Sequence, residues 1–272
     1  MLSPSYSITP QDYWKAIATR DAPQLIDVRP REIYEQSAHL LPGAIRYDAG
    51  KVTEWKANLD PARPIVAACK AGHERSQMVV AQLRADGLDA RVLEGGYEGW
   101  SKSGLPLVAK TELMRVAPNR IWVTRRRPKI DRIACPWLIR RFLDPKARIL
   151  FVDADQVTNV ARESGGVPFD IKDVELSHVG ERCSFDTMLG LFGLESEPSL
   201  ARLALIVRGA DTARPDIAAE AAGLHAVSLG LSALAGDDDH GLLERGFMVY
   251  DALFAWLRFA AEERHNWPAK AA

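Results

Sequence analysis

The sequence contains little cysteine and no excess of charge of either sign. Its 272 residues include 3 cysteines, Cys69, Cys135 and Cys183, and so few and widely spaced thiols exclude a disulfide framework. The 35 Lys and Arg side chains nearly balance the 36 Asp and Glu side chains, and the net charge is −1. Nucleic-acid-binding domains usually carry a clear basic excess, so this balance argues against nucleic acid as a partner.

Long apolar stretches are also missing from the sequence. It has no apolar run long enough to cross a bilayer and no apolar amino-terminal segment with a basic flank. We therefore expect neither a membrane helix nor a signal peptide. We expect a cytoplasmic protein whose thiols stay reduced. No internal repeat is present, which excludes a solenoid or a propeller.

The pattern of apolar residues changes near the middle of the chain. The first half alternates short apolar runs such as QLIDV and PIVAAC with helical periodicity, which predicts an α/β domain with a mainly parallel sheet. The second half combines strand-like runs such as IWVTRR with several long helical patterns, which predicts a mostly α-helical domain with a few strands. We place the first domain at 1–108, a linker at 109–120 and the second domain at 121–272.

The most informative stretch is PIVAACKAGHERSQ, residues 64–77. Its apolar run ends in Cys69, so this thiol follows the carboxyl end of a predicted buried strand, where open parallel sheets bind ligands. A turn with Gly72 comes next, and a helix is predicted to begin near Ser76. Backbone N–H groups in such a turn, together with a helix N-terminus, favour an anion. We therefore expect a lowered pKa for the Cys69 thiol and a role as a nucleophile.

Other residues of this loop carry both signs of charge. Lys70, His73 and Arg75 add positive charge near the thiol, and Glu74 opposes them. The alternative to a reactive thiol is a small cysteine that is merely buried at a strand end, because free cysteine is often buried. The glycine turn and the charged residues that follow Cys69 favour the reactive thiol.

Three ordered signatures in the first 106 residues resemble those of the rhodanese family. They are LIDVRPREIYEQSAHLLPGAI, which includes Asp27 and Arg29, then CKAGHERS, and then VLEGGYEGWSKSGLP. The resemblance implies that Cys69 takes sulfur from a donor such as thiosulfate as a persulfide and delivers it to a thiophilic acceptor, a thiol or a protein, without any cofactor. It implies that Arg75 and the rest of the loop steady the anionic donor and the persulfide. That substrate-binding set is Lys70, Ala71, Gly72, His73, Glu74 and Ser76.

The spacing inside the loop leaves a second reaction open. Five residues separate Cys69 from Arg75, whereas the usual sulfurtransferase loop is one residue shorter. The wider spacing is that of the phosphatase and arsenate-reductase relatives of this fold, and a wider ring of amides suits a tetrahedral oxyanion such as chromate. Those relatives usually have histidine just before the cysteine, where this chain has Ala68. We prefer sulfurtransfer and keep oxyanion reduction or phosphate-ester hydrolysis as the alternative.

The second half is similar to the C-terminal domain of chromate-resistance proteins of the ChrB type. The similarity runs in order from about Trp122 to Trp256 and includes PFDIKDVELSHVGERCSFDTML and GLLERGFMVYDALFAW. It implies a link to chromate sensing or resistance, so a non-catalytic sensor of chromate or a metal is a third interpretation. A rhodanese-like domain stands where regulatory members have their usual N-terminal region, which also argues against DNA binding.

Metal-ligating residue types occur at several places in the second half. His178 and Cys183 lie in ELSHVGERCSFD, and His240 follows an acidic triplet. Imidazole and thiolate suit Zn²⁺ or another transition metal, so these three residues are our candidate metal ligands. Their spacing matches no zinc signature. Cys183 and the acidic triplet are equally typical of helix starts.

Two charged segments of the second half also need an explanation. RRRPKIDR places five cations within 125–132, which suggests a solvated charged loop or, alternatively, an anion or nucleic-acid site. VRGADTARPD places Arg208, Asp211, Arg214 and Asp216 between two predicted helices. There we expect helix capping and an Arg–Asp pair across the turn.

Overall fold

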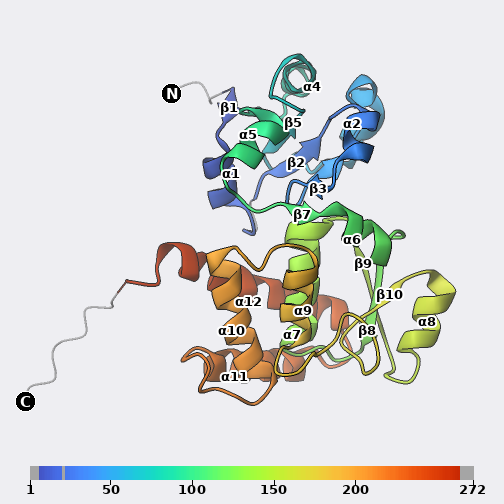
Figure 1. The fold of residues 1–272 in the computed structure, drawn as a ribbon, viewed down its shortest axis with the longest axis vertical. Coiled ribbons are helices and arrows are strands. Elements are labelled where there is room, and N and C mark those ends of the chain that lie inside the picture. The colour runs from blue at the N-terminus through green and yellow to red at the C-terminus, as the bar shows by residue number, and fades with distance from the viewer. Residues whose placement is uncertain (1–5, 20–21, 264–272) are drawn as a thin grey trace, which may run out of the picture.

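The structure, a computed structural model, describes residues 6–19 and 22–263. Figure 1 shows an α/β part, formed by the amino-terminal elements, above a helix-rich part formed by the rest of the chain. The first part contains a parallel sheet, and the second contains mainly helices with a small sheet. Both predicted fold classes are confirmed.

A five-stranded parallel sheet forms the centre of the first part, with the strand order β1-β6-β5-β2-β4. Its strands are β1 (Ser7–Ile8), β2 (Gln24–Asp27), β4 (Ile45–Arg46), β5 (Ile65–Ala68) and β6 (Ala90–Leu93). The helices of this part are α1 (Pro10–Ala16), α2 (Arg31–Gln36), α3 (Val52–Trp55), α4 (Glu74–Ala85) and α5 (Gly96–Lys102), with short turns η1 (Ala49–Lys51) and η2 (Lys56–Asn58) around α3.

The Cys69 side chain, directly after the central strand β5, points toward helix α4. Successive side chains of a strand point to opposite faces of the sheet. Val66 and Ala68 accordingly lie in the large core that continues into the second part, whereas Ala67 and Cys69 lie in a smaller core beneath α4. The alternation of β5 therefore places the thiol on the side where α4 begins.

The second part consists of a three-stranded parallel sheet, β10-β8-β9, and a group of helices. The strands are β8 (Ile121–Arg125), β9 (Arg148–Val152) and β10 (Val167–Pro168). The helices are α7 (Asp131–Leu138), α8 (Val157–Ser164), α9 (Ser184–Leu191), α10 (Pro198–Asp211), α11 (Ala221–Ala235) and α12 (Asp239–Phe259), and a π-helical turn, η3 (Ile139–Leu143), continues α7. In the part of the chain that the structure describes, no helix has both the length and the apolar character needed to cross a membrane.

The segment expected to be a linker, 109–120, is folded. Strand β7 (Val108–Ala109) pairs antiparallel with β3 (His39–Leu40), and α6 (Lys110–Val116) follows directly. The Lys110 ammonium donates hydrogen bonds to two backbone carbonyls at the end of α2. The apolar periodicity was too weak to predict this helix because α6 is short and buries few of its residues.

One aromatic cluster joins the two parts. Trp14 of α1 contacts Phe142 of η3 edge-on, with ring centroids 6.0 Å apart. Phe142 also contacts Trp137 and Phe254, at centroid distances of 5.3 and 5.6 Å. Such pairs contribute about 0.5–1.5 kcal/mol each beyond the burial of their area. The two parts therefore share a continuous core.

Candidate active site

The Cys69 sulfur is surrounded by hydrogen-bond donors. Cys69 is 5% exposed and lies between the end of β5 and the start of α4. The Ser76 hydroxyl, in the first turn of α4, donates to Sγ at 3.2 Å. Backbone groups of Ser76, Ala71 and His73 also hydrogen-bond to the sulfur. All of these donors come from the loop and the helix start that follow the cysteine in the sequence.

These donors lower the pKa of the Cys69 thiol. Burial has the largest single effect and acts in the opposite direction, because it disfavours the charged thiolate. The Ser76 hydroxyl and the three backbone groups together outweigh burial, so the pKa lies below its ordinary value. More of the cysteine is therefore in its nucleophilic form near neutral pH.

The start of α5 fixes the shape of the thiol loop. Two backbone N–H groups of α5 donate to the carbonyls of Cys69 and Lys70, each at 2.9 Å. A Cβ added to Gly96 would lie 2.3 Å from the Cys69 carbonyl oxygen and 2.6 Å from the Gly72 nitrogen. A side chain at position 96 would therefore push the loop away, which explains the second glycine of the pair in the third signature.

Most other residues of the loop line its outer surface. Its exposed residues are Lys70, His73, Glu74 and Arg75, and its half-buried residues are Ala71 and Gly72. Lys70 lies 3.5 Å from the Glu98 carboxylate. Helix α4 begins at Glu74 rather than near Ser76, so Arg75 belongs to its first turn. Within residues 6–19 and 22–263, Arg75 forms no ion pair, which leaves its guanidinium available to an anionic substrate.

A buried ion pair supports the sheet edge beside the thiol loop. Arg29 Nε lies 3.0 Å from Asp27 Oδ1, and Arg29 Nη2 lies 2.6 Å from Asp27 Oδ2. The same guanidinium lies over the Tyr97 ring, 4.0 Å from its centroid. Tyr97 belongs to the start of α5, whose amides bind the loop. Asp27 and Arg29, noted in the sequence only as signature residues, therefore help to position that helix.

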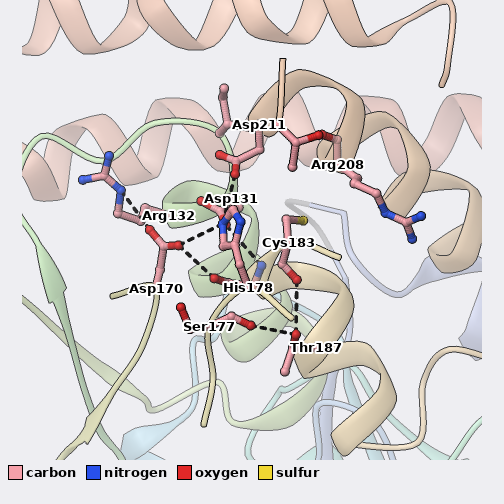
Figure 2. Close-up of polar contacts among 12 residues, drawn as sticks. Asp131, Arg132, Asp170, Ser177, His178, Cys183, Thr187, Arg208 and Asp211 are labelled. Atoms are coloured by element: carbon pink, nitrogen blue, oxygen red, sulfur yellow. Dashed lines mark hydrogen bonds and ion pairs between the residues drawn. The ribbon is translucent and has the colours of Figure 1, made fainter. Parts of the chain in front are cut away.

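A second polar cluster lies in the helix-rich part (Figure 2). His178 Nε2 is 3.3 Å from Asp131 Oδ2, 3.5 Å from Asp170 Oδ1 and 3.2 Å from Asp211 Oδ2. Asp131 begins α7, Asp211 ends α10, and Asp170 and His178 lie between β10 and α9. Segments far apart in the sequence thus bring three carboxylates to one imidazole nitrogen.

Protonation in this cluster is shifted by burial and by close contact. Burial raises the pKa of Asp131, because the carboxylate loses its hydration. Hydrogen bonds to Asp131 and Asp170 raise the pKa of His178. Both shifts favour a proton held between the Asp131 carboxylate and the imidazole.

Asp170 differs from Asp131 because cations bind it from outside the cluster. Arg125 Nη2 lies 2.9 Å and Arg132 Nε lies 3.2 Å from its Oδ2, and the Ser184 hydroxyl donates to Oδ1 at 2.8 Å. Burial opposes its ionisation. Hydrogen bonds from His178, Ser184 and Arg125 nevertheless lower the pKa of Asp170, which is therefore an ionised carboxylate.

The structure does not bring the predicted metal ligands together. Among the described residues, the group with closely spaced ligand atoms is Asp131, Asp170 and His178. Cys183 is instead the buried N-cap of α9, where burial raises the pKa of its thiol well above the ordinary value. His240 lies in the first turn of α12 and packs edge-on against the Phe151 ring, with centroids 5.5 Å apart. Of the predicted set, only His178 belongs to the cluster.

The three aspartates of the cluster were not predicted as ligands. Asp131 and Asp170 each lie beside apolar residues that are buried in the structure, in KIDRIA and VPFDI. This position beside apolar residues is the only local sequence feature that could have indicated buried carboxylates. Asp211 was assigned to helix capping. The expected Arg–Asp pair across that turn is formed by Arg214 and Asp216, at 3.0 Å.

The basic run at 125–132 is largely neutralised by aspartates. Its ion pairs join Arg125 and Arg132 to Asp170, Arg126 to Asp153, and Arg127 to Asp237. A surface that binds a polyanion needs cations free of such partners. These pairs favour the interpretation as a charged loop.

Comparison with known proteins finds relatives of both halves. The family model of the ChrB C-terminal domain matches residues 122–257, and that of the rhodanese-like domain matches residues 9–103. Protein ChrB of Cupriavidus metallidurans is 38% identical over 136 residues, which cover 50% of this chain and 40% of that protein. The chain thus spans less than half the length of that relative.

Relatives of the first half include an enzyme and a solved structure. Thiosulfate sulfurtransferase GlpE of Actinobacillus succinogenes is 33% identical over 101 residues, which cover 37% of this chain and 87% of that protein. A rhodanese-related protein of Thermoplasma volcanium is 25% identical with a TM-score of 0.34, and the match covers 39% of this chain and 99% of that chain. This TM-score is low, so the fold assignment depends on the sheet topology and the family models.

Proposed function

The chain belongs to the ChrB C-terminal domain family and carries a rhodanese-like domain before that domain, and from this premise we propose that it is a sulfurtransferase linked to chromate resistance. Cys69 accepts one sulfur atom as a persulfide and passes it to a thiophilic acceptor. The supporting observation is the ring of donors around Cys69 Sγ. These donors stabilise the attacking thiolate, and we expect amides of the same loop to stabilise the negative charge that the persulfide carries on its outer sulfur.

The proposed reaction proceeds in two displacements. The Cys69 thiolate attacks the outer sulfur of thiosulfate, the sulfur–sulfur bond of the donor breaks, and sulfite leaves with the electron pair. A nucleophile such as cyanide or a thiolate then attacks the terminal sulfur of the persulfide and releases the Cys69 thiolate. The exposed cations Lys70 and Arg75 attract the dianionic donor. The second part of the chain binds the acceptor or responds to an oxyanion.

Mass spectrometry of the purified chain after treatment with thiosulfate tests this proposal. We expect a gain of one sulfur atom on the peptide that contains Cys69, and loss of that sulfur when cyanide is added. Cys135 and Cys183, both 0% exposed, serve as internal controls that stay unmodified. A Cys69 peptide of unchanged mass, in protein whose Cys69 still reacts with iodoacetamide, would contradict sulfurtransfer from thiosulfate.

Reduction of an oxyanion or hydrolysis of a phosphate ester is the second candidate. It is favoured by the five-residue spacing between Cys69 and Arg75 and by the unpaired state of Arg75 among the described residues. Chromate consumption or phosphate-ester turnover that Cys69→Ser abolishes would support this candidate. If Cys69→Ser instead leaves chromate resistance of the host intact, the chain acts in resistance as a sensor without catalysis at the thiol.

A further inference from the structure

We propose that Asp131, Asp170, His178 and Asp211 bind one divalent transition-metal ion in the helix-rich part. One ligand atom from each of Asp131, Asp170 and His178 can be chosen so that all three lie within 4.8 Å of one another. Asp211 Oδ2 approaches the same imidazole nitrogen, at 3.2 Å. Of the ligands predicted from the sequence, only His178 belongs to this site. The site is separate from the thiol loop of Cys69.

The spacing of these atoms suits a common coordination centre. His178 Nε2 lies 3.2–3.5 Å from one oxygen of each of the three carboxylates. Nitrogen and oxygen ligands bind a tetrahedral Zn²⁺ ion at about 2.0–2.2 Å, which places neighbouring ligands roughly 3.3–3.6 Å apart. The distances from the imidazole nitrogen to the three carboxylates therefore match those between ligands of one tetrahedral ion.

The single hydrogen that His178 Nε2 can carry does not satisfy the three carboxylates around it. Three carboxylate oxygens face His178 Nε2, and a ring nitrogen carries at most one hydrogen. That hydrogen can form one well-aligned bond, so the imidazole cannot donate to all three carboxylates, although Ser184 also donates to Asp131 Oδ2 and to Asp170 Oδ1. A metal ion that replaces the hydrogen can bind all three oxygens and the nitrogen at once.

The burial of Asp131 provides an independent reason to expect a cation. Its side chain is 2% exposed, and no Lys or Arg among the described residues forms an ion pair with it. Its carboxylate also accepts a hydrogen bond from the Ser184 backbone N–H, at 3.3 Å, and is hydrogen-bonded to the Asp211 side chain. Buried carboxylates are normally paired with a cation or bound to a metal. Among the described residues, the cationic partner of Asp131 is the His178 imidazole, and the Asp131 carboxylate faces the interior of the cluster (Figure 2).

The residues around the cluster orient the Asp170 carboxylate and leave His178 accessible from solvent. Arg125 and Arg132 contact Asp170 Oδ2, and the Ser184 hydroxyl donates a hydrogen bond to Oδ1. These contacts fix the orientation of the carboxylate, as outer hydrogen bonds usually do for metal ligands. His178 is 41% exposed at its side chain and borders an open pocket that Asp170 also lines. An ion can therefore enter from solvent, and water can complete its coordination.

The donor set indicates the class of ion. Three carboxylates and one imidazole combine hard oxygen ligands with one nitrogen, which suits Mn²⁺, Fe²⁺ or Zn²⁺. The set contains no thiolate, since Cys183 caps α9, and this argues against Cu⁺. Zn²⁺ is expected to bind more tightly than Mn²⁺, following the general order of first-row affinities.

Titration of the full chain with Mn²⁺ after chelator treatment tests this proposal. Loss of the free-ion signal in electron paramagnetic resonance counts the bound Mn²⁺, and added Zn²⁺ should release it. We expect one Mn²⁺ per chain. We expect Asp131→Asn and His178→Gln to weaken binding on the order of 100-fold or more, because each removes a direct ligand. The matched control is Asp173→Asn, an exposed residue of the same pocket outside the cluster.

Three results would overturn the proposal. The first is that the parent chain binds neither Mn²⁺ nor Zn²⁺ at one ion per chain. The second is that Asp131→Asn and His178→Gln bind Mn²⁺ as tightly as the parent chain. The third is that Asp173→Asn loses as much affinity as the ligand variants. If Asp131→Asn does not fold, as judged by circular dichroism, the less buried Asp211→Asn replaces it and should lose affinity. Sulfur uptake at Cys69 is measured on the same samples, so failure of the metal site and failure of sulfurtransfer are distinguishable.

Discussion

At the scale of single residues, the thiol site depends on neighbours in the sequence, and the carboxylate cluster does not. The donors to Cys69 come from the seven residues that follow it, so the stretch CKAGHERS was enough to predict a stabilised thiolate. The cluster joins Asp131, Asp170 and Asp211 from three separate segments. Their approach depends on how helices α7 and α10 pack, and no local pattern encodes that packing.

The Ser76 hydroxyl is the one side chain among the described residues that donates to the Cys69 sulfur. We therefore expect Ser76→Ala to raise the pKa of Cys69 and to slow its alkylation by iodoacetamide at neutral pH roughly tenfold, because a hydrogen bond to a charged group contributes about 1.5–3 kcal/mol. Alkylation rises with pH as the thiolate forms, so the profile should move to higher pH. Ser101→Ala, an exposed serine of α5, is the control, and equal profiles for both variants would contradict the role of Ser76.

Arg75 should act on the substrate and not on the thiol. We expect Arg75→Ala to raise the KM for thiosulfate roughly tenfold, because a cation that binds the anionic donor is lost. Alkylation by neutral iodoacetamide should stay unchanged, and Arg75→Lys should recover part of the affinity. A slower alkylation in Arg75→Ala would instead show that the guanidinium stabilises the thiolate itself.

At the scale of elements, the start of α5 shapes the loop that carries the thiol. In the sequence, the paired glycines are recognisable only as part of the third signature, which does not predict their contact with the thiol loop. The contact between the two turns depends on strands β5 and β6 lying side by side. The short apolar runs predicted the strands but not the close approach of the turns beyond them. Gly96 is where that approach is tightest.

We expect Gly96→Ala to reduce sulfur uptake more than tenfold, since its Cβ would collide with the Cys69 carbonyl and displace the loop amides. Gly104→Ala is a matched control, because Gly104 also has a positive φ, 72°, but has no atom within 4 Å of the added Cβ. Both variants carry the backbone strain of about 1–2 kcal/mol. Thiosulfate-dependent mass gain and thermal unfolding are measured for both, and equal activity would show that the contact at Gly96 is unimportant.

At the scale of the whole molecule, the two family regions share one hydrophobic core, from which we expect cooperative unfolding. The sequence predicted two domains correctly in class, but the shared core and the folded segment 109–120 could not be read from it, since apolar periodicity does not reveal which surface a helix contacts. We expect Trp14→Ala to lower stability by about 3–5 kcal/mol, the usual effect of deleting a buried aromatic side chain. Urea unfolding should follow one transition whether it is monitored by circular dichroism or by alkylation of Cys135, which lies in α7. Two separate transitions would contradict the shared core.

The position of Lys110 has a consequence for any attempt to dissect this chain. Its ammonium donates hydrogen bonds to two half-buried carbonyls near the end of α2, although Lys110 follows the last rhodanese-like signature in the sequence. A truncation that stops at Ala109 would keep every recognisable signature residue of the amino-terminal family and still leave those carbonyls without their cation. We therefore expect an amino-terminal fragment that ends at Ala109 to be less stable than one that extends through α6.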